Sequence, residues 1–232
     1  MSFAKELFAA AHPHPIAEHP FVAAVRSGTA STESIRTFAL HIASATEAFV
    51  RSLYAILAIC PNERVRQALI GNVLEEEGAT SYVPGVGATF DPARRHPPMA
   101  RRFALAAGVT DADVDAFEVG PPRWYARALQ EGNWIGPLAY VAVGTEANIP
   151  LTYREIIPAL SEHYGFSNAD LEFLIEHVTA DDRHGLDGAM MIESVAHTDQ
   201  ARRQALEGAR RGGNGWWQIL RKHVTEPIAL TS

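Results

Sequence analysis

The chain has little of what would place it outside the cell or in a membrane. Its 232 residues include one cysteine, Cys60, which excludes an intrachain disulfide and favours a reducing compartment. No window approaches the run of about 18 consecutive apolar residues that a membrane-spanning helix needs. The first residues also lack the basic and apolar regions of a secretory signal. These absences predict a cytoplasmic protein with no membrane partner.

Positive charge is also scarce. Lys and Arg number 20 against 27 Asp and Glu, which gives a net charge of −7 and argues against nucleic acid as a partner. The apolar content of 47% is ordinary for a globular protein. The length suits one domain over residues 1–232 with a sizeable core.

Signals for β-hairpins are missing as well, because no Asn-Gly or Asp-Gly pair separates two alternating strands. The pattern predicts an all-α chain. Ser31 opens the first long helix, Gly78 caps the second, and Ser167 with Asp170 forms a capping box for a later one. The expected helices cover residues 31–59, 63–77, 99–107, 111–118, 122–131 and 137–160, the segment after the capping box, and the tail around Trp216.

Two segments are expected to be irregular. Residues 79–98 contain several prolines and glycines and form the longest loop-like stretch, of a length often found in lids and site walls. Residues 212–215, Gly-Gly-Asn-Gly, have no phosphate-binding pattern around them and predict a turn.

A helical stripe between residues 177 and 184 carries the strongest signal for chemistry. His177, Asp181 and His184 stand at i, i+4 and i+7, which stacks them on one face of a helix. Two imidazoles and a carboxylate are suitable ligands for iron or manganese. The same stripe is apolar on both sides, so these groups need partners if they are buried. The alternative, a polar patch of hydrogen-bonded histidines, stays open at this point.

Two glutamates could supply the other half of a site. Glu146 has small or apolar helical neighbours. Pro150, four residues later, has no amide hydrogen to donate to the Glu146 carbonyl, so it should kink the helix there. The alternative for Glu146 is pairing with an arginine. Glu76 and Glu77 flank the apolar stripe of their helix, whereas Glu75 points away. Carboxylates at a helix C-terminus interact unfavourably with the helix dipole, so their presence there indicates a functional role. Of the two, we select Glu76 as the ligand.

Candidates for substrate contact are weaker. Glu47 lies four residues before Arg51, a spacing that usually indicates an ordinary ion pair, but its surroundings are small and apolar. Glu47, Arg51, Tyr54 and Tyr140 are therefore candidate substrate-binding residues by helix position.

The order Glu76, Glu146, His177-x-x-x-Asp181-x-x-His184 resembles the heme-oxygenase-like diiron oxidases, a superfamily shared with thiaminase II and pyrroloquinoline-quinone synthase. Supporting fragments are His19-Pro20-Phe21, Cys60-Pro61 and Thr145-Glu146-Ala147-Asn148-Ile149-Pro150. The resemblance covers about residues 15–195. It implies a single heme-oxygenase-like seven-helix bundle, usually assembled as a homodimer.

The resemblance also implies two irons, held by Glu76, His96, Glu146, His177, Asp181 and His184. In the family a histidine follows the Glu-Gly segment at closer range. Here the first histidine is His96, beyond an inserted loop. This departure leaves three alternatives: the protein binds a single iron, binds the second iron weakly, or uses no metal.

The activity implied by the resemblance is that of an iron- and O2-dependent oxidase or oxygenase. Such enzymes cleave C–C bonds or oxygenate nitrogen on small amino- or fatty-acid-like substrates. One alternative is a metal-independent relative, either a quinone-forming oxidase or a thiaminase-like hydrolase. Against the hydrolase, Cys60 falls at a helix end and is not placed as a nucleophile. A non-enzymatic helical binding module is the remaining alternative.

Overall fold

The computed structural model describes residues 2–83 and 86–225, without the side chains of residues 179–183 and 223–225. The prediction of an all-α chain is confirmed, since the described residues form eleven α-helices and one short hairpin. The helices are α1 Phe3–Ala11, α2 Pro20–Arg26, α3 Thr32–Ile59, α4 Glu63–Glu76, α5 His96–Ala106, α6 Asp111–Ala116, α7 Arg123–Gln130, α8 Ile135–Ala139, α9 Ile149–Tyr164, α10 Glu172–Glu193 and α11 Asp199–Thr225.

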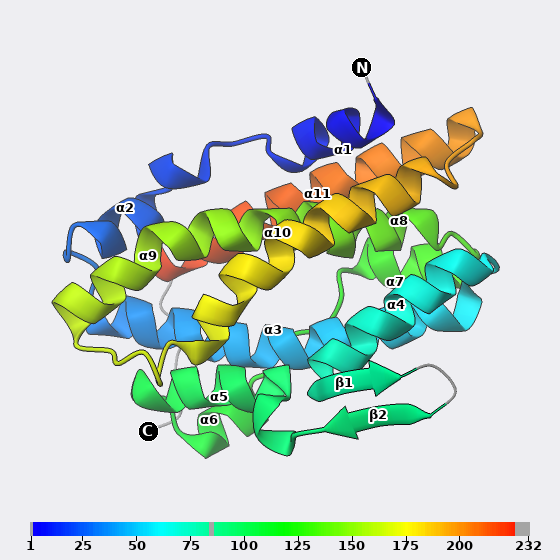
Figure 1. Ribbon diagram of the computed structural model, residues 1–232. Helices are drawn as coiled ribbons and strands as arrows, with labels where there is room; N and C mark the ends of the chain where they lie inside the picture. Colours follow the sequence, from blue (N-terminus) through cyan, green and yellow to red (C-terminus); the bar gives the residue numbers. More distant parts are fainter. Residues whose placement is uncertain (1, 84–85, 226–232) are drawn as a thin grey trace.

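The long helix α3 lies in the middle of the molecule. Helices α9, α10 and α11 lie on one side of it and α5 and α6 on the other, while α1 and α2 cover the outer face of the first group (Figure 1). Helix α10 packs along both α9 and α5, so it joins the two sides. This arrangement brings α4, α5 and α10, which are distant in sequence, to one place.

Local sequence signals explain where several helices begin. The Ser31 hydroxyl accepts a hydrogen bond from the Ser34 amide at 3.0 Å at the start of α3, as expected for an N-cap. Both hydrogen bonds of the predicted capping box form, since the Ser167 amide donates to Asp170 Oδ2 at 2.8 Å and the Asp170 amide to Ser167 Oγ at 3.2 Å. They close a turn just before α10, however, because α10 begins at Glu172 and its N-cap residue is Leu171. Gly78 follows the end of α4 with φ +82°, a left-handed conformation that favours glycine.

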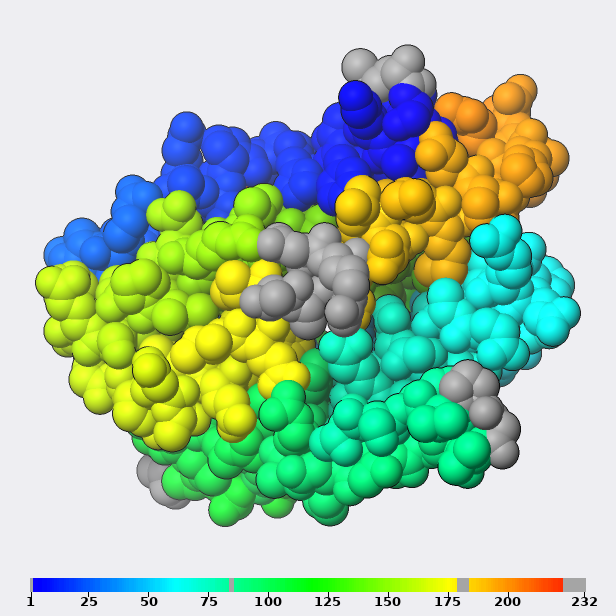
Figure 2. Space-filling view, viewed as in Figure 1, coloured from blue at the N-terminus to red at the C-terminus, as the bar shows by residue number. Residues whose placement is uncertain are grey.

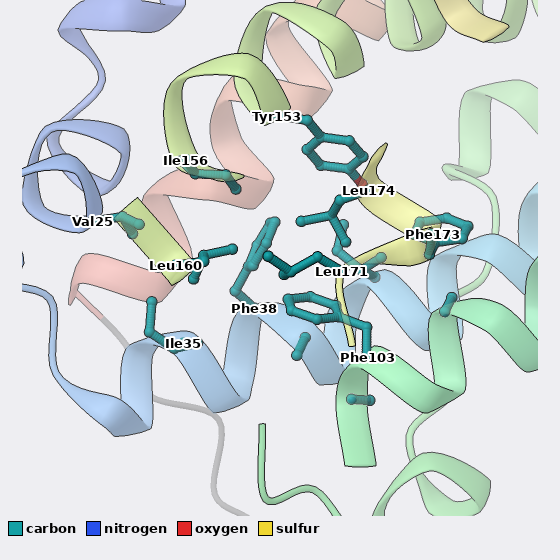
Figure 3. Packing of buried hydrophobic residues seen from close by; sticks show 14 of the residues in the cluster. Val25, Ile35, Phe38, Phe103, Tyr153, Ile156, Leu160, Leu171, Phe173 and Leu174 are labelled. Atoms are coloured by element: carbon teal, nitrogen blue, oxygen red, sulfur yellow. The ribbon is translucent and has the colours of Figure 1, made fainter. Parts of the chain in front are cut away.

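Two clusters of buried apolar side chains hold the helices together. One is centred on Phe38 of α3 and Phe103 of α5, whose rings are 6.2 Å apart, and includes Tyr153, Leu171 and Phe173 (Figure 3). The other cluster joins α1, α4, α8 and the first part of α11. Burying one large apolar side chain contributes about 1.5–3 kcal/mol, so these clusters supply most of the favourable folding free energy.

Helix α3 is long and apolar enough to cross a membrane by length and composition alone. That is weak evidence, because the central helix of a compact helical protein passes the same test. Its buried residues Ile35, Phe38 and Leu40 belong to the first cluster. We therefore interpret α3 as a core helix, and the absence of a membrane partner stays a prediction.

The predicted loop over residues 79–98 is wrong in part. Strands β1 (Ala79–Val83) and β2 (Gly87–Phe90) pair antiparallel from Ala79 opposite Phe90 to Val83 opposite Gly87. Most of their side chains are exposed, so the strands lack the alternation of buried and exposed residues by which a strand is recognised. The hairpin forms the lower right edge of the face shown in Figure 2. Helix α5 then begins at His96, three residues earlier than predicted.

The predicted turn at residues 212–215 is also wrong, because these residues lie inside α11. A Cβ atom on Gly208 would collide with the carbonyl oxygen of Gly136, and one on Gly212 with that of Tyr140. The glycines therefore let the backbone of α11 lie directly against α8 and the segment that follows it. This requirement for close approach outweighs the low helix propensity of glycine.

Candidate metal centre

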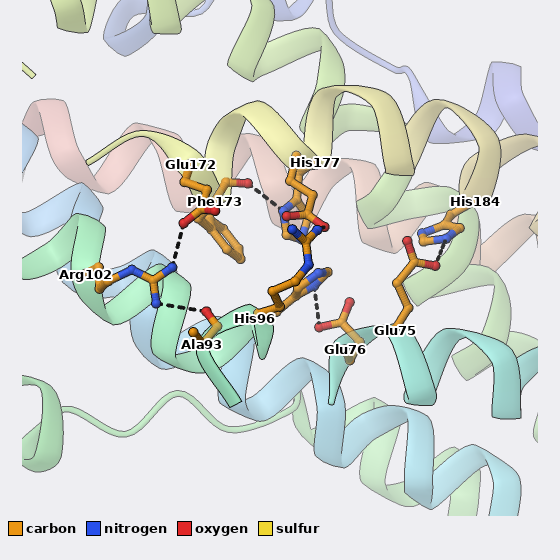
Figure 4. A network of polar contacts seen from close by, with 11 residues as sticks. Glu75, Glu76, Ala93, His96, Arg102, Glu172, Phe173, His177 and His184 are labelled. Atoms are coloured by element: carbon orange, nitrogen blue, oxygen red, sulfur yellow. Dashed lines mark hydrogen bonds and ion pairs between the residues drawn. The ribbon is translucent and has the colours of Figure 1, made fainter. Parts of the chain in front are cut away.

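Three side chains from three helices meet in the interior. One ligand atom each from Glu76 of α4, His96 of α5 and His177 of α10 lies within 4.8 Å of the other two, and all three residues are buried. Figure 4 shows the three side chains pointing toward one another. A carboxylate and two imidazoles in this arrangement suit a divalent metal with intermediate ligand preference, such as iron. The donor set of the three residues present therefore fits a bound iron.

The orientation of His177 follows from one hydrogen bond. Its Nδ1 lies 2.7 Å from the carbonyl oxygen of Phe173, and a carbonyl can only accept, so Nδ1 carries the proton. In the neutral ring, the other nitrogen, Nε2, then offers its lone pair to a metal. Histidines that bind metals are held in this way, with one nitrogen donating to a fixed acceptor.

His96 lies against both other members of the cluster. Its Nδ1 is 2.9 Å from Glu76 Oε2, and its ring centre is 4.5 Å from that of His177. The insertion between Glu76 and His96 does not separate them, because the Asp91 amide donates to the Gly78 carbonyl at 2.9 Å and closes the base of the hairpin. The inserted residues thus form a hairpin whose two ends lie side by side, so His96 still reaches the cluster.

Two ion pairs align α10 over α5. Arg102 of α5 contacts Glu172 at 2.7 Å, and Arg94, in the turn before α5, contacts Glu176 at 2.8 Å. Surface pairs of this kind contribute about 0–1 kcal/mol each, so their main effect here is on position. Both pairs join α10 to the segment around α5 in the register in which His177 faces His96.

The three consecutive glutamates at the end of α4 have separate contacts. Glu76 belongs to the cluster, whereas Glu77 binds Arg95 at 2.7 Å and accepts a hydrogen bond from the Tyr54 hydroxyl at 3.4 Å. The expectation that Glu75 points away is wrong, because its Oε2 lies 3.1 Å from His184 Nε2. The sequence pattern of α4 could not predict this contact, because the partner His184 lies on α10.

The second part of the predicted ligand set is placed less completely. His184 is buried, with 8% of its surface exposed, and it lies about two turns beyond His177 on α10, beside Glu75. The side chain of Asp181 lies outside the described residues. The structure therefore places His184 on the buried side of α10, next to Glu75.

Glu146 is 3% exposed and lies at a break in the helix, as Pro150 predicts. The break is longer than expected, since residues Tyr140–Thr145 form a π-helical segment and Glu146–Asn148 a 3-10 turn before α9 begins. The Asn148 side chain donates to the carbonyls of Gly144 at 2.8 Å and Ala11 at 3.0 Å. Such π-helical segments are frequent at functional sites, because they turn a side chain away from the regular helical direction.

A cavity of about 130 Å³ adjoins the cluster, and we call it the chamber. Glu76, Glu146 and His177 form its polar end, and the rest of its lining is mainly apolar or aromatic. Tyr140 lines the chamber, and burial raises the pKa of its hydroxyl group, which keeps it protonated. The chamber volume is close to that of an apolar cavity of about 150 Å³ that accepts benzene.

The other predicted wall residues lie elsewhere. Glu47 and Arg51 pair at 3.2 Å and line a separate outer cleft. Tyr54 is 48% exposed and lines neither the chamber nor the outer cleft. Residues that the sequence did not single out line the chamber instead: Phe49, Tyr125, Tyr153, Phe173 and Trp216. In a sequence, apolar residues that line a cavity look the same as residues of the packed core, so no sequence signal distinguishes these five.

Residues 36–217 match a family described as iron-containing redox enzymes. The chain belongs to this family. Together with the buried Glu-His-His cluster, this membership identifies the protein as an iron-dependent oxidoreductase.

Similar sequences include two proteins named 4-aminobenzoate synthase. The one from Chlamydia muridarum is 26% identical over 90% of this chain and 85% of its own length. The one from Chlamydia trachomatis is 27% identical over 78% of this chain and 75% of its own length.

Solved structures agree on the fold. A TenA homologue from Pseudomonas syringae superposes with a TM-score of 0.71 at 13% identity, over 96% of this chain and 89% of its own. A domain with a heme oxygenase-like fold from Shewanella denitrificans gives 0.62 at 15% identity, over 91% of this chain and 86% of its own. The predicted heme-oxygenase-like fold is confirmed.

Proposed function

We propose that the protein is an O2-dependent non-haem diiron oxidase or oxygenase. Its substrate is a small amino-acid-like molecule with a ring-sized apolar group. The observation that carries this proposal is the buried cluster of Glu76, His96 and His177 at the end of a chamber of about 130 Å³. The name of the Chlamydia relatives, 4-aminobenzoate synthase, supports an aromatic ring in the chemistry.

Each predicted ligand has a role in the proposal. Glu76, His96 and His177 hold one iron, and Glu146, Asp181 and His184 hold the other. Glu75 positions the imidazole of His184 through its contact at 3.1 Å. Bound iron would supply the redox steps and open positions for O2 and substrate.

The remaining chamber residues bind and orient the substrate. Their apolar surface excludes water and favours a ring over a charged group. The hydroxyl of Tyr125 donates to the carbonyl of Ser52 at 3.2 Å, which fixes that wall of the chamber. Burial also raises the pKa of Tyr125, so this hydroxyl keeps its proton and its hydrogen bond at neutral pH.

Two further predictions remain part of the proposal. The net charge of −7 supports a small molecule as the partner, with neither nucleic acid nor an anionic membrane. A cytoplasmic homodimer is the expected state, and light scattering on the eluting protein gives the oligomer directly.

The proposed function is tested by exposing anaerobic Fe(II)-loaded protein to O2. We expect two irons per chain by metal analysis and an absorbance change that depends on both iron and O2. Iron-loaded protein whose spectrum does not respond to O2, with or without small aromatic amino acids, would contradict the proposal. A metal-independent relative would instead retain its activity after chelation.

A further inference from the structure

A second cavity lies beside the chamber. It has a volume of about 670 Å³, and we call it the outer cleft. Its lining carries charges of both signs, among them Glu47, Arg51 and Arg101. The lining of the chamber, by contrast, is mainly apolar, and its charged or ionisable groups are chiefly the predicted ligands Glu76, Glu146 and His177.

The two cavities share part of their walls. Six residues line both of them: Ala48 and Ser52 of α3, Val119, Gly120 and Pro121 of the connection between α6 and α7, and Tyr125 of α7. A residue that lines both cavities belongs to the boundary between them. We call this group of six the neck.

The connection that forms one side of the neck is tied to α3 at both ends. The Ser44 hydroxyl donates to the Phe117 carbonyl at one end, and the Tyr125 hydroxyl donates to the Ser52 carbonyl at 3.2 Å at the other. Between these anchors, Pro121 and Pro122 have no amide hydrogen to donate. A Cβ on Gly120 would meet no atom within 4 Å. The centre of the connection can therefore shift without breaking packed contacts at Gly120.

We infer that the neck is the passage by which the substrate enters the chamber, and that it selects molecules by width. The outer cleft collects a molecule with a polar end, and the neck admits its ring-sized apolar part. Small side chains at Ala48 and Gly120 set the width of the passage. This inference rests on the proposed function only in taking the chamber as the place where substrate meets iron.

Helix α3 offers a matched set of positions for a test. Thr46 lines the chamber but not the outer cleft, Ala48 lines both cavities, and Ala55 lines the outer cleft but not the chamber. A thiol at Thr46→Cys, in a Cys60→Ala background, reports arrival in the chamber. The probe is 4,4′-dithiodipyridine, a neutral disulfide of two ring-sized groups. The thiolate attacks its disulfide, a mixed disulfide forms, and coloured 4-thiopyridone leaves.

We expect Ala48→Phe to slow labelling of the residue-46 thiol about tenfold or more, because labelling is limited by access. Ala55→Phe should leave the rate unchanged, and Val119→Ala should increase it. Equal rates in all three variants, with or without iron, would overturn the inference. If Ala48→Phe fails to fold, Val119→Ala still decides, since an unchanged rate contradicts a passage at the neck.

The natural thiol provides the control for unfolding. Cys60 is 4% exposed and lies in the other core cluster, and burial raises its pKa. Labelling of Cys60 in the chain with Thr46 intact measures opening of the structure itself. The neck variants must leave that rate unchanged. The readout needs neither substrate nor turnover, so it can fail while the proposed function stands, and the reverse also holds.

Discussion

Adjacent glutamates at the end of α4 differ sharply in their surroundings. Glu76 is 6% exposed and lies within ligand distance of two imidazoles, whereas Glu77 binds Arg95, whose side chain is 42% exposed. One residue of sequence thus separates a buried ligand candidate from an ordinary surface ion pair. The helix turns by about 100° per residue, so neighbouring side chains face different parts of the molecule.

This difference gives a prediction for metal binding. Fe(II) added anaerobically should raise the Tm of the wild-type protein, because a ligand that binds only the folded state stabilises it. Glu76→Gln should lose most of this increase, since it removes a charged ligand. Glu77→Gln should retain it and lose at most about 1 kcal/mol of stability from the surface pair. Differential scanning fluorimetry measures both, and the opposite ranking would transfer the ligand role to Glu77.

The sequence could predict part of this cluster at the residue scale. His177 and Glu76 were recognised because each lies on or beside the apolar stripe of its own helix, which is a local property. Glu75 was misassigned because its partner His184 comes from another helix. His96 followed from the family resemblance, and its arrival at Glu76 depends on a hairpin that the local sequence does not announce.

At the scale of elements, helix α11 depends on the absence of side chains. A Cβ on Gly212 would lie 2.5 Å from the Cα of Gly144, which is a backbone atom and cannot move aside as a flexible side chain could. Gly71 in the middle of α4 has no atom within 4 Å of the corresponding position. The same substitution therefore has opposite consequences in the two helices.

We predict that Gly212→Ala destabilises the protein by about 1–3 kcal/mol, since it overpacks a close contact between α11 and the π-helical segment. Gly71→Ala should instead stabilise it by about 0.5–1 kcal/mol, because alanine is the better helix former. Urea denaturation followed by circular dichroism measures both changes. Two equal effects would mean that α11 does not pack as closely as described.

The elements themselves were predictable where their signals are local. The Ser31 cap fixes the start of α3, and the capping box at Ser167 precedes α10. The hairpin was missed because its side chains are mostly exposed, so its strands have no apolar alternation. The glycines near residue 212 were read as a turn, because only the partner backbone explains why they are needed in a helix.

At the scale of the whole molecule, two buried histidines link folding to pH. Burial lowers the pKa of His19 and of His41 from 6.5 to about 4, and the nearby cations Arg221 and Lys222 act in the same direction. The Phe21 amide donates to His19 Nδ1 at 3.1 Å, which also requires that nitrogen to be unprotonated. Both histidines are thus neutral in the folded protein at neutral pH.

Stability should therefore decrease on acidification. Between pH 6.5 and 4 the unfolded chain binds protons at these histidines that the folded protein does not, so the free energy of unfolding falls as the pH falls through this window. At pH 5 each histidine should account for a loss of about 2 kcal/mol. Urea denaturation at pH 7 and pH 5 tests this. His41→Asn should reduce the pH dependence, whereas the same substitution at exposed His197 should not.

The central claim is that Glu76, His96 and His177 bind iron together, and His96 tests it most directly because it lies beyond the inserted hairpin. The measurement is the iron-to-protein ratio after anaerobic loading with Fe(II) and desalting, for the wild-type protein, His96→Ala and the exposed control His197→Ala. We predict that His96→Ala loses at least one iron per chain while His197→Ala matches the wild-type protein. An unchanged ratio in a folded His96→Ala variant would contradict the account.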